Sequence, residues 1–461
     1  MQLERHNADT YIRKAPGWFL NYAARHLSVP VEPGTGTEQQ FRFGVHWTHV
    51  GAEGPRRYAS LLRQNTVPAG LTAHVEALAA HYGLPCHVTD ARKPPEEYIP
   101  LWSLRAAWRP YQEDVHRQVQ RYETGVVDAP PRSGKTLMAA RIIDTLNQPT
   151  VWIAPSVQIV RQTFGVLKEH FGGDYVSRLD GSAKPEDKDP EKKVVVTTPI
   201  SAARMPAEWW ATRTCLIIDE FHHSAADTYH RISALATNAY YRYGFTGTHY
   251  RTGDDRLAME AICSYRLHKI TVPYLVDNGW LAQPKVVISR VNGSSGGTDF
   301  ATAYRKGIVE FEPRNEMVVS IAKQCLSQGI PTLVLTRRRK HADAIADRIR
   351  GAVVVKGGEN AMTSQAVLDF TAGKHECLVG TTVIGEGVDV PRAGALVYAC
   401  GGNDGVMMMQ SYFRPLTATP GKDYGYIYDF YDAQHSTLRK HSARRIEMVR
   451  NQLGPDCLVR P

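Results

Sequence analysis

The hydrophobic positions of this chain fall, from about residue 101 onward, into short apolar runs that alternate with amphipathic stretches. Runs at 125–128, 151–154, 194–198, 216–218 and 243–245 are typical of buried strands, while 137–146 and 157–170 have helical spacing. A second series follows, with strand-like runs at 332–335, 353–355, 377–379, 395–398 and 426–428. Such alternation predicts parallel sheets covered by helices on both faces.

The first hundred residues follow a different pattern. Alternation over 41–47 predicts a strand, helical spacing over 71–82 predicts a helix, and 86–88 is consistent with a closing strand. Residues 30–37 are expected to form a loop, and the Lys-Pro-Pro sequence at 93–95 marks a linker. We therefore predict a small α+β domain at 1–100, with α/β regions at 101–290 and 300–461. The sequence NGSSGGT at 292–298 is predicted to be a flexible segment separating them.

Composition narrows the class of protein. A chain of 461 residues can form two or three domains, and 43% hydrophobic with 22% charged residues is ordinary for a soluble globular protein. The net charge of +9 favours an acidic polymer as partner, although some basic proteins bind none. No apolar run approaches membrane-spanning length, and residues 1–14 lack the apolar core of a secretory signal. We expect a cytoplasmic protein that does not bind a membrane.

The seven cysteines are scattered and none forms a CxxC pair. This spacing indicates neither a zinc site nor a disulfide framework. Cys215 and Cys400 adjoin apolar runs and are expected to be buried thiols.

The octet APPRSGKT at 129–136 fits the phosphate-binding loop GxxxxGK[ST], except that Ala129 replaces the first glycine. It lies between a predicted strand and a predicted helix, where backbone N–H groups and the helix N-terminus can face phosphate oxygens. Lys135 is expected to reach the β- and γ-phosphates, and the Thr136 hydroxyl to bind Mg²⁺. The other nucleotide-contacting positions predicted in this loop are Pro131, Arg132, Ser133 and Gly134.

A second element, LIIDEFHH at 216–223, makes a chance match to the loop pattern improbable. It is an apolar strand that ends in two carboxylates. We expect Asp219 to hold the metal and Glu220 to activate the attacking water. The two elements together predict ATP and Mg²⁺ as ligands.

The order of these motifs resembles that of superfamily 2 helicases and translocases, in which two RecA-like lobes close over ATP. RPYQ at 109–112 is similar to the adenine-recognising element of that family, which implies nucleotide contacts for Arg109 and Gln112. DEFH at 219–222 resembles the DExH element, and TGT at 246–248 the coupling element to which His222 would connect it. IAP at 153–155 and TTP at 197–199 resemble elements that contact a nucleic-acid strand, implying such contacts for Pro155, Gln162 and Thr198.

The second half continues the resemblance with GTTVIGEGVDVP at 380–391, similar to motif V, and QSYFRPLT at 410–417 in the position of motif VI. The residues that this implies are Thr381 for nucleic acid and Gly387, Asp389, Gln410 and Arg414 for the nucleotide. Motif VI departs from the family because Phe413 replaces a glycine and Thr417 replaces the arginine finger, a group worth about 10³–10⁵ in rate. Either Arg414 or Arg392 takes that role, or hydrolysis is slow or depends on a partner.

The resemblance implies an α/β fold of two RecA-like parallel-sheet lobes in tandem, preceded by the small α+β domain, which is expected to bind nucleic acid. Residues 66–71 and 81–86, upstream of RPYQ, resemble more weakly the N-terminal domain of phage UvsW-type branch-migration helicases. The implied function is that of an ATP-dependent DNA helicase or translocase acting on duplex, forked or single-stranded DNA in a bacterial or phage-infected cell.

Two other functions stay open: a nucleic-acid-binding ATP switch that hydrolyses little, and an RNA helicase. Basic residues are the candidate phosphate contacts, although each could simply lie on a solvated helix face. They are Arg337, Arg338, Arg339 and Lys340, together with Arg439, Lys440, Arg444, Arg445 and Arg450 of the predicted C-terminal helix.

Overall fold

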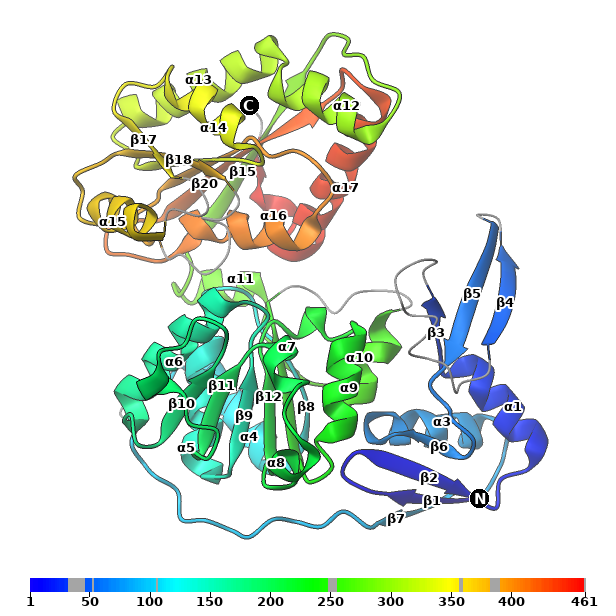
Figure 1. Cartoon of the computed structure of the whole chain (residues 1–461). Coiled ribbons are helices and arrows are strands. Elements are labelled where there is room, and N and C mark those ends of the chain that lie inside the picture. Colours follow the sequence, from blue (N-terminus) through cyan, green and yellow to red (C-terminus); the bar gives the residue numbers. More distant parts are fainter. Residues whose placement is uncertain are drawn as a thin grey trace. The chain divides into compact units, whose positions relative to one another are not determined.

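A computed structural model describes residues 1–31, 46–51, 54–104, 107–247, 255–355, 360–381 and 390–459 (Figure 1). The chain divides into two compact units. The first comprises Met1–Ala129 and Gly134–Lys269, and the second Ile270–Pro461 together with Pro130–Ser133.

The N-terminal part of the first unit is a small α+β domain, as predicted. One sheet has the strand order β6-β2-β1-β7, in which β1 pairs antiparallel with β2 and parallel with β7. A three-stranded antiparallel sheet has the order β3-β5-β4. The elements are β1 (Gln2–Arg5), β2 (Asp9–Arg13), α1 (Gly17–His26), β3 (Ser28–Val31), β4 (His46–Gly51), β5 (Gly54–Ser60), β6 (Thr66–Pro68), η1 (Ala69–Leu71), α3 (Thr72–His81) and β7 (His87–Asp90).

The predicted loop at 30–37 was wrong at its start, because Pro30 and Val31 belong to β3, where they pair with β5. Residues 32–45 lie outside the described part of the chain, so most of that loop and most of the predicted strand at 41–47 are not described.

The small domain packs directly on a helix of the first lobe, α10 (Asp255–Cys263). Ala258 and Ala261 of α10 belong to the same apolar cluster as Phe19 and Val75 of the domain. A Cβ atom at Gly70 would lie 2.1 Å from the carbonyl oxygen of Glu260, so only glycine allows this approach. The domain is therefore continuous with the first lobe in one compact unit.

The first lobe contains a seven-stranded sheet with the order β10-β11-β9-β12-β13-β8-β14, in which every pairing is parallel. The central strands β9, β11 and β12 are buried at every position, because helices cover both faces. The elements are α4 (Pro110–Arg121), β8 (Thr124–Asp128), α5 (Lys135–Leu146), β9 (Thr150–Ile153), α6 (Val157–Phe171), β10 (Val176–Leu179), η2 (Pro185–Asp187), β11 (Val194–Thr197), α7 (Pro199–Ala202), α8 (Ala207–Ala211), β12 (Cys215–Ile218), η3 (Phe221–His223), α9 (Asp227–Leu235), β13 (Tyr241–Thr246), α10 and β14 (Arg266–Lys269).

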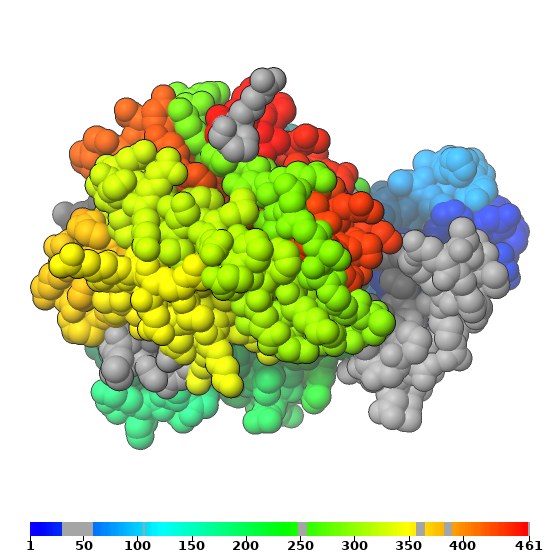
Figure 2. All heavy atoms as spheres, turned by 90° about the horizontal axis from the view of Figure 1, so that it is seen from above, coloured from blue at the N-terminus to red at the C-terminus, as the bar shows by residue number. Residues whose placement is uncertain are grey.

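The second lobe repeats this plan with a seven-stranded parallel sheet of order β17-β18-β16-β19-β20-β15-β21. In Figure 2 the yellow-green to yellow part of the chain, which contains α12 to α14, covers the face of this lobe that points to the viewer. The elements are α11 (Val272–Asp277), β15 (Gln283–Val291), α12 (Phe300–Tyr304), η4 (Arg305–Val309), α13 (Glu312–Ser327), β16 (Thr332–Thr336), α14 (Arg339–Ala346), β17 (Ala352–Val355), α15 (Asn360–Thr371), β18 (Cys377–Thr381), β19 (Ala395–Tyr398), α16 (Gly405–Tyr412), η6 (Arg414–Leu416), β20 (Tyr424–Asp432), α17 (Ser436–Leu453), η7 (Pro455–Cys457) and β21 (Leu458–Val459).

The boundary between the lobes differs from the predicted one near residue 290. Strand β15 lies before that boundary, yet it pairs with β20 over its whole length, from Gln283 to Val291. The segment 292–298 is likewise part of the second unit: the Ser295 N–H donates to the carbonyl of Gln434, and the Gly297 carbonyl lies 3.0 Å from His435 Nε2. Its glycines permit a tight turn, so the composition that suggested a linker reflects a packed loop.

Candidate active site

The predicted phosphate-binding loop connects β8 to α5, the position expected for it. Left-handed backbone in the loop falls on Arg132, with φ of 71°, and on Gly134, with φ of 81°. A Cβ atom at Gly134 would also lie 2.7 Å from Gln112 Nε2, so this glycine is required for two reasons. Ala129 has no such backbone requirement; it is fully buried, and its N–H donates to the Thr246 carbonyl at 2.8 Å. This explains why alanine is accommodated where the motif has glycine.

The two carboxylates follow β12, as expected. The Asp219 N–H donates to the Ile153 carbonyl at 2.8 Å, which continues the parallel pairing of β12 with β9. Glu220 has left-handed backbone, with φ of 45°, and its N–H donates to Asp219 Oδ1 at 2.8 Å. The turn brings Glu220 Oε1 to 4.0 Å from Lys135 Nζ, which also lies 3.5 Å from the Ala129 carbonyl. Loop lysine and both carboxylates therefore lie together at the carboxyl ends of β8 and β12.

Asp219 is held in an electrostatic environment that favours a bound cation. Only 7% of the residue is exposed. Burial, together with the neighbouring Glu220 carboxylate, raises the pKa of its carboxyl group to about 6, although Lys135 opposes the rise. A buried carboxylate whose charge is poorly compensated binds a divalent cation readily. The described part of the chain holds no group of three or more His, Cys, Asp or Glu side chains that could bind a metal ion.

His222 connects the carboxylates to the coupling element. Its Nδ1 lies 3.4 Å from Glu220 Oε2 and 3.3 Å from Thr246 Oγ1. Thr246 also accepts the Ala129 N–H, so the loop, the Asp219–Glu220 turn and the end of β13 form one series of contacts. Thr248, the third residue of the predicted coupling element, lies outside the described residues.

The predicted adenine-recognising element lies at the start of α4. The Arg109 N–H donates to Gln112 Oε1 at 3.0 Å, and Arg109 Nη1 donates to the Tyr111 hydroxyl at 3.1 Å. Because Gln112 also adjoins Gly134, the structure brings this element beside the phosphate loop.

The predicted nucleic-acid contacts of the first lobe cluster at two helix starts. Ser156 caps α6 by accepting the Ile159 N–H, and Thr198 caps α7 by accepting the Ser201 N–H. These helices follow β9 and β11, which are neighbouring parallel strands, so both helix starts lie at one sheet edge. Pro155 is half-buried just before α6, and Gln162 is exposed on it.

In the second lobe, Thr381 is the last residue of β18 and is buried, whereas Gly387 and Asp389 lie outside the described residues. The basic residues 337–340 are all exposed where β16 leads into α14. They lie at the carboxyl edge of the sheet, as Thr381 does, because β16 and β18 are paired in parallel. The candidate nucleic-acid contacts of this lobe therefore share one edge.

Motif VI forms α16 and the turn η6. Gln410 is half-buried, whereas Arg414 is 5% exposed. Phe413, which replaces the family glycine, is 2% exposed and fills apolar core. Thr417 forms a bridge with Leu281 next to β15. The substitutions in this motif are thus structurally accommodated within the lobe.

Arg392, the alternative candidate for the arginine finger, is committed to other partners. It donates to the carbonyls of Phe370 and His375, and it pairs with Glu376 at 2.6 Å. These contacts fix the end of α15 to the segment before β19.

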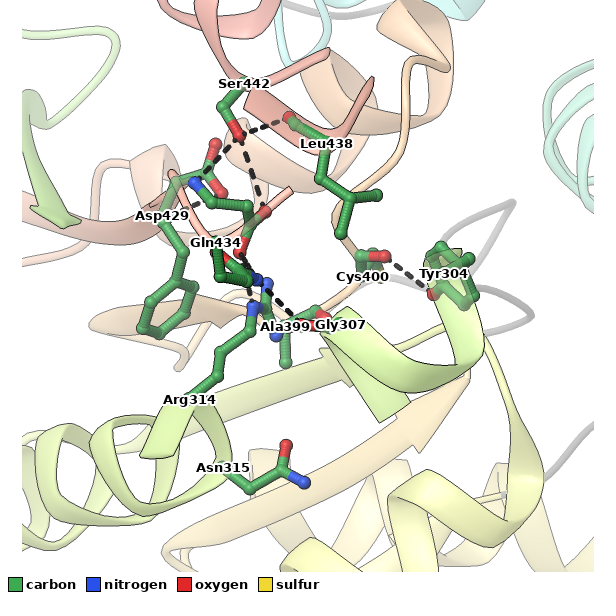
Figure 3. A network of polar contacts seen from close by, with 12 residues as sticks. Tyr304, Gly307, Arg314, Asn315, Ala399, Cys400, Asp429, Gln434, Leu438 and Ser442 are labelled. Atoms are coloured by element: carbon green, nitrogen blue, oxygen red, sulfur yellow. Dashed lines mark hydrogen bonds and ion pairs between the residues drawn. The ribbon is translucent and has the colours of Figure 1, made fainter. Parts of the chain in front are cut away.

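A buried ionic network, which the sequence interpretation missed, joins α17 to the second sheet (Figure 3). Arg445 donates to both oxygens of Asp429 at 2.9 and 3.1 Å, and Arg314 donates to Asp432 at 2.8 Å. The Tyr412 hydroxyl also donates to Asp429, at 2.7 Å. Arg445 is 1% exposed, so its predicted role as a nucleic-acid contact was wrong. Arg439, Lys440, Arg444 and Arg450 are exposed.

The helical spacing of α17 contained a signal for this burial. Leu438, Ser442, Arg445, Val449 and Leu453 recur at the intervals of one helix face, and all are buried. Because Arg445 shares the helix face of these residues and not that of the exposed basic residues, the spacing of α17 predicts that Arg445 is buried.

Comparisons with known proteins agree with this geometry. Residues 105–251 match the family model described as type III restriction enzyme, res subunit, a span that includes the loop, the carboxylates and Thr246. Beyond this span, the chain is similar to proteins named as DNA helicases and translocases. The ATP-dependent DNA helicase uvsW of Enterobacteria phage T4 is 19% identical over 430 residues, which cover 85% of this chain and 84% of that protein. A DNA 3'-5' translocase of Sulfurisphaera tokodaii is 22% identical, covering 64% and 75%.

Other relatives are longer. The chain spans about half the length of relatives from Haloarcula marismortui and Halobacterium salinarum, 48% and 49%, each 24% identical. Among solved structures, the ATP-dependent Type ISP restriction-modification enzyme LlaBIII bound to DNA superposes with a TM-score of 0.57 at 16% identity, covering 78% of this chain and 31% of that one. This likeness supports the tandem RecA-like fold. No described helix is long and apolar enough to span a membrane.

Proposed function

We propose that this protein is an ATP-dependent DNA helicase or translocase that acts on duplex or branched DNA. The observation that carries the proposal is the contact series of Lys135, Glu220, His222 and Thr246, which assembles the parts of an ATP-hydrolysing site at one sheet edge. The choice of DNA rests on the relatives named as DNA helicases or translocases and on the net charge of +9. The phage relative makes a role in DNA repair or recombination part of the proposal.

In the proposed reaction the protein mainly positions groups and stabilises charge, since phosphoryl transfer asks little covalent chemistry of it. Lys135 binds the β- and γ-phosphate oxygens. Glu220 orients the attacking water and accepts its proton, and its 4.0 Å separation from Lys135 Nζ places base and cation side by side. Mg²⁺, held by Asp219 and Thr136, would neutralise charge on the phosphate oxygens. His222 contacts both Glu220 and Thr246, and so couples the position of Glu220 to strand β13 and the rest of the lobe.

We assign the cationic group of the second lobe to Arg414. Arg392 is bound to Glu376 and to two carbonyls, and Thr417 carries no charge. A guanidinium is required because it presents a fork of donors that stays charged at any working pH. Gln410, one helical turn before Arg414, is assigned to the nucleotide together with Arg109, Gln112, Gly387 and Asp389.

Nucleic-acid contacts are assigned to two sets of residues, one in each lobe. The first lobe contributes Pro155, Gln162 and Thr198 near the helix starts, and the second contributes Thr381, Arg337 and Arg338. Such groups bind mainly phosphates, so binding should be weakened by salt and depend little on sequence.

The proposal is tested by ATP hydrolysis in the presence of forked DNA. Forked DNA should stimulate turnover in the wild type, and Lys135→Ala and Glu220→Gln should each abolish it. Lys168→Ala, which removes an exposed lysine paired with Asp187, is the matched control and should behave as wild type. Absence of stimulation by any nucleic acid would exclude the proposed function.

A second candidate function is favoured by Thr417: a nucleic-acid-binding switch that uses ATP as a conformational ligand and hydrolyses little. Under this alternative, wild-type turnover is slow, and Thr417→Arg raises it by about ten-fold or more, since an arginine finger is worth about 10³–10⁵ in rate. Brisk wild-type turnover would exclude it. An RNA helicase is a third candidate, distinguished by comparing RNA with DNA as stimulants of hydrolysis.

A further inference from the structure

The N-terminal domain carries a cluster of aromatic rings at its surface, of which Tyr82 is partly buried against the core. Trp18, Tyr22 and His26 lie along one side of α1, and Tyr82 follows α3; we call these four residues the aromatic face. Trp18 and Tyr22 are each 47% exposed. Single exposed aromatic residues are common, but a contiguous group of this kind marks an interaction surface.

The core contacts of α1 are made by a different stripe of residues, about 100° around the helix axis from these rings. Phe19, Ala23 and Leu27 bury the inner side of the helix in the core of the domain. Trp18, Tyr22 and His26 recur at intervals of four residues and therefore form a separate, outward stripe.

The rings support one another while leaving their surfaces available. The Tyr82 ring lies 5.7 Å from Trp18 and 5.3 Å from Tyr22, measured between centroids. Tyr22 and His26 are stacked at 6.1 Å with an interplanar angle of 27°, and His26 Nδ1 lies 2.9 Å from the Tyr22 carbonyl. Mutual packing limits the rotamers of these side chains, so little conformational entropy is lost when a ligand stacks on them.

The charges around the aromatic face favour an anionic partner. Arg25, on α1, and Lys14, just before it, are exposed, and α1 carries no acidic residue. Glu76 is the single acidic residue of α3. Aromatic surfaces next to cations are the combination that binds single-stranded nucleic acid, since rings stack on bases and cations contact phosphates.

We propose that the aromatic face binds unpaired bases of a single DNA strand. The inference rests on the proposed function and adds to it, because branched DNA offers single-stranded arms. The small domain is packed on α10 of the first lobe, so a strand bound there is held in the same compact unit as the ATP site.

The experiment measures binding of the full-length protein to two labelled 30-nucleotide DNAs by fluorescence anisotropy at one fixed salt concentration. One is oligothymidine, and the other has the same backbone with abasic sites throughout. The variants are Trp18→Ala/Tyr22→Ala and, as conservative rescue, Trp18→Phe/Tyr22→Phe. Trp102→Ala is the matched control, because Trp102 is 69% exposed outside the aromatic face.

The double alanine variant should bind oligothymidine about five-fold or more weakly, since one stacked base is worth at least that factor. It should bind the abasic DNA as the wild type does, and the phenylalanine variant and Trp102→Ala should stay close to wild type on both. Equal losses on both DNAs, or no loss on either, would overturn the inference. The same preparations separate the two claims. If no nucleic acid stimulates ATP hydrolysis by the wild type, the proposed function is refuted. If hydrolysis is stimulated but the double alanine variant binds oligothymidine as the wild type does, only this inference is refuted.

Discussion

Replacing Arg445 by methionine should strongly destabilise the second unit, although the sequence presents this residue as one basic position among several. Methionine fills much of the volume of the arginine stem but removes every donor. It leaves the carboxylate of Asp429 buried, with the Tyr412 hydroxyl and the Phe430 N–H as remaining donors. It also removes the donors to the carbonyls of Gly402 and Phe430, at 2.7 and 2.8 Å.

The expected magnitude follows from the burial of both partners. Arg445 and Asp429 are each 1% exposed, and breaking such a pair by removing one partner costs about 3–5 kcal/mol. At about 2–4 °C per kcal/mol for a unit of this size, the unfolding midpoint should fall by about 6–20 °C. Scanning calorimetry of the full chain should show the shift in the transition of the second unit.

The adjacent residue provides a matched control. Arg444 is exposed, so Arg444→Met should change the unfolding free energy by no more than about 0.5 kcal/mol. Adding Asp429→Leu to Arg445→Met should recover part of the loss, because no unpaired charge then remains buried. Equal, small effects of the two arginine substitutions would refute the assignment of Arg445 to a buried network.

Two further predictions follow from buried or crowded positions. Burial lowers the pKa of His341 to about 3, so the folded state excludes a proton that the unfolded chain binds below pH 6.5. Stability is therefore lost as pH falls from 6.5 toward 3, by about 2 kcal/mol at pH 5. In urea unfolding at pH 7.5 and pH 5, His341→Gln should remove this part of the pH dependence. An unchanged dependence of the unfolding free energy on pH in the variant would contradict the prediction. Gly134→Val places a side chain at a φ of 81° and against Gln112, and should weaken binding of a fluorescent ATP analogue about ten-fold or more. Gly181→Val, where the new side chain meets no neighbouring atom, should not weaken this binding. Equal affinities of the two variants for the ATP analogue would contradict the role of the loop.

The sequence was sufficient where one local pattern determines the structure. The loop between β8 and α5 and the carboxylates after β12 were predicted because each motif needs only its own strand and turn. Sheet membership was harder to predict. The strand β15 belongs to the second lobe because it pairs with β20, a partner more than a hundred residues away that no local pattern reveals.

Charge in a helix was also ambiguous from sequence. Arg444 and Arg445 are adjacent and chemically identical, yet one is exposed and the other buried. The difference depends on the helix face and on Asp429, which lies 16 residues earlier on another element, β20. The small domain was predicted to be separate from the first lobe. The close approach of Gly70 to the Glu260 backbone joins the two, and no local sequence pattern reveals that contact.

The most direct test of the account is displacement of a triplex-forming oligonucleotide from duplex DNA, which reports ATP-driven movement along DNA. The account predicts displacement by the wild type with ATP, and none with a non-hydrolysable ATP analogue or with Glu220→Gln. Displacement that does not depend on ATP would contradict the claim that this chain is a DNA motor. The claim would also be contradicted if DNA strongly stimulated ATP hydrolysis by the protein but no oligonucleotide were displaced.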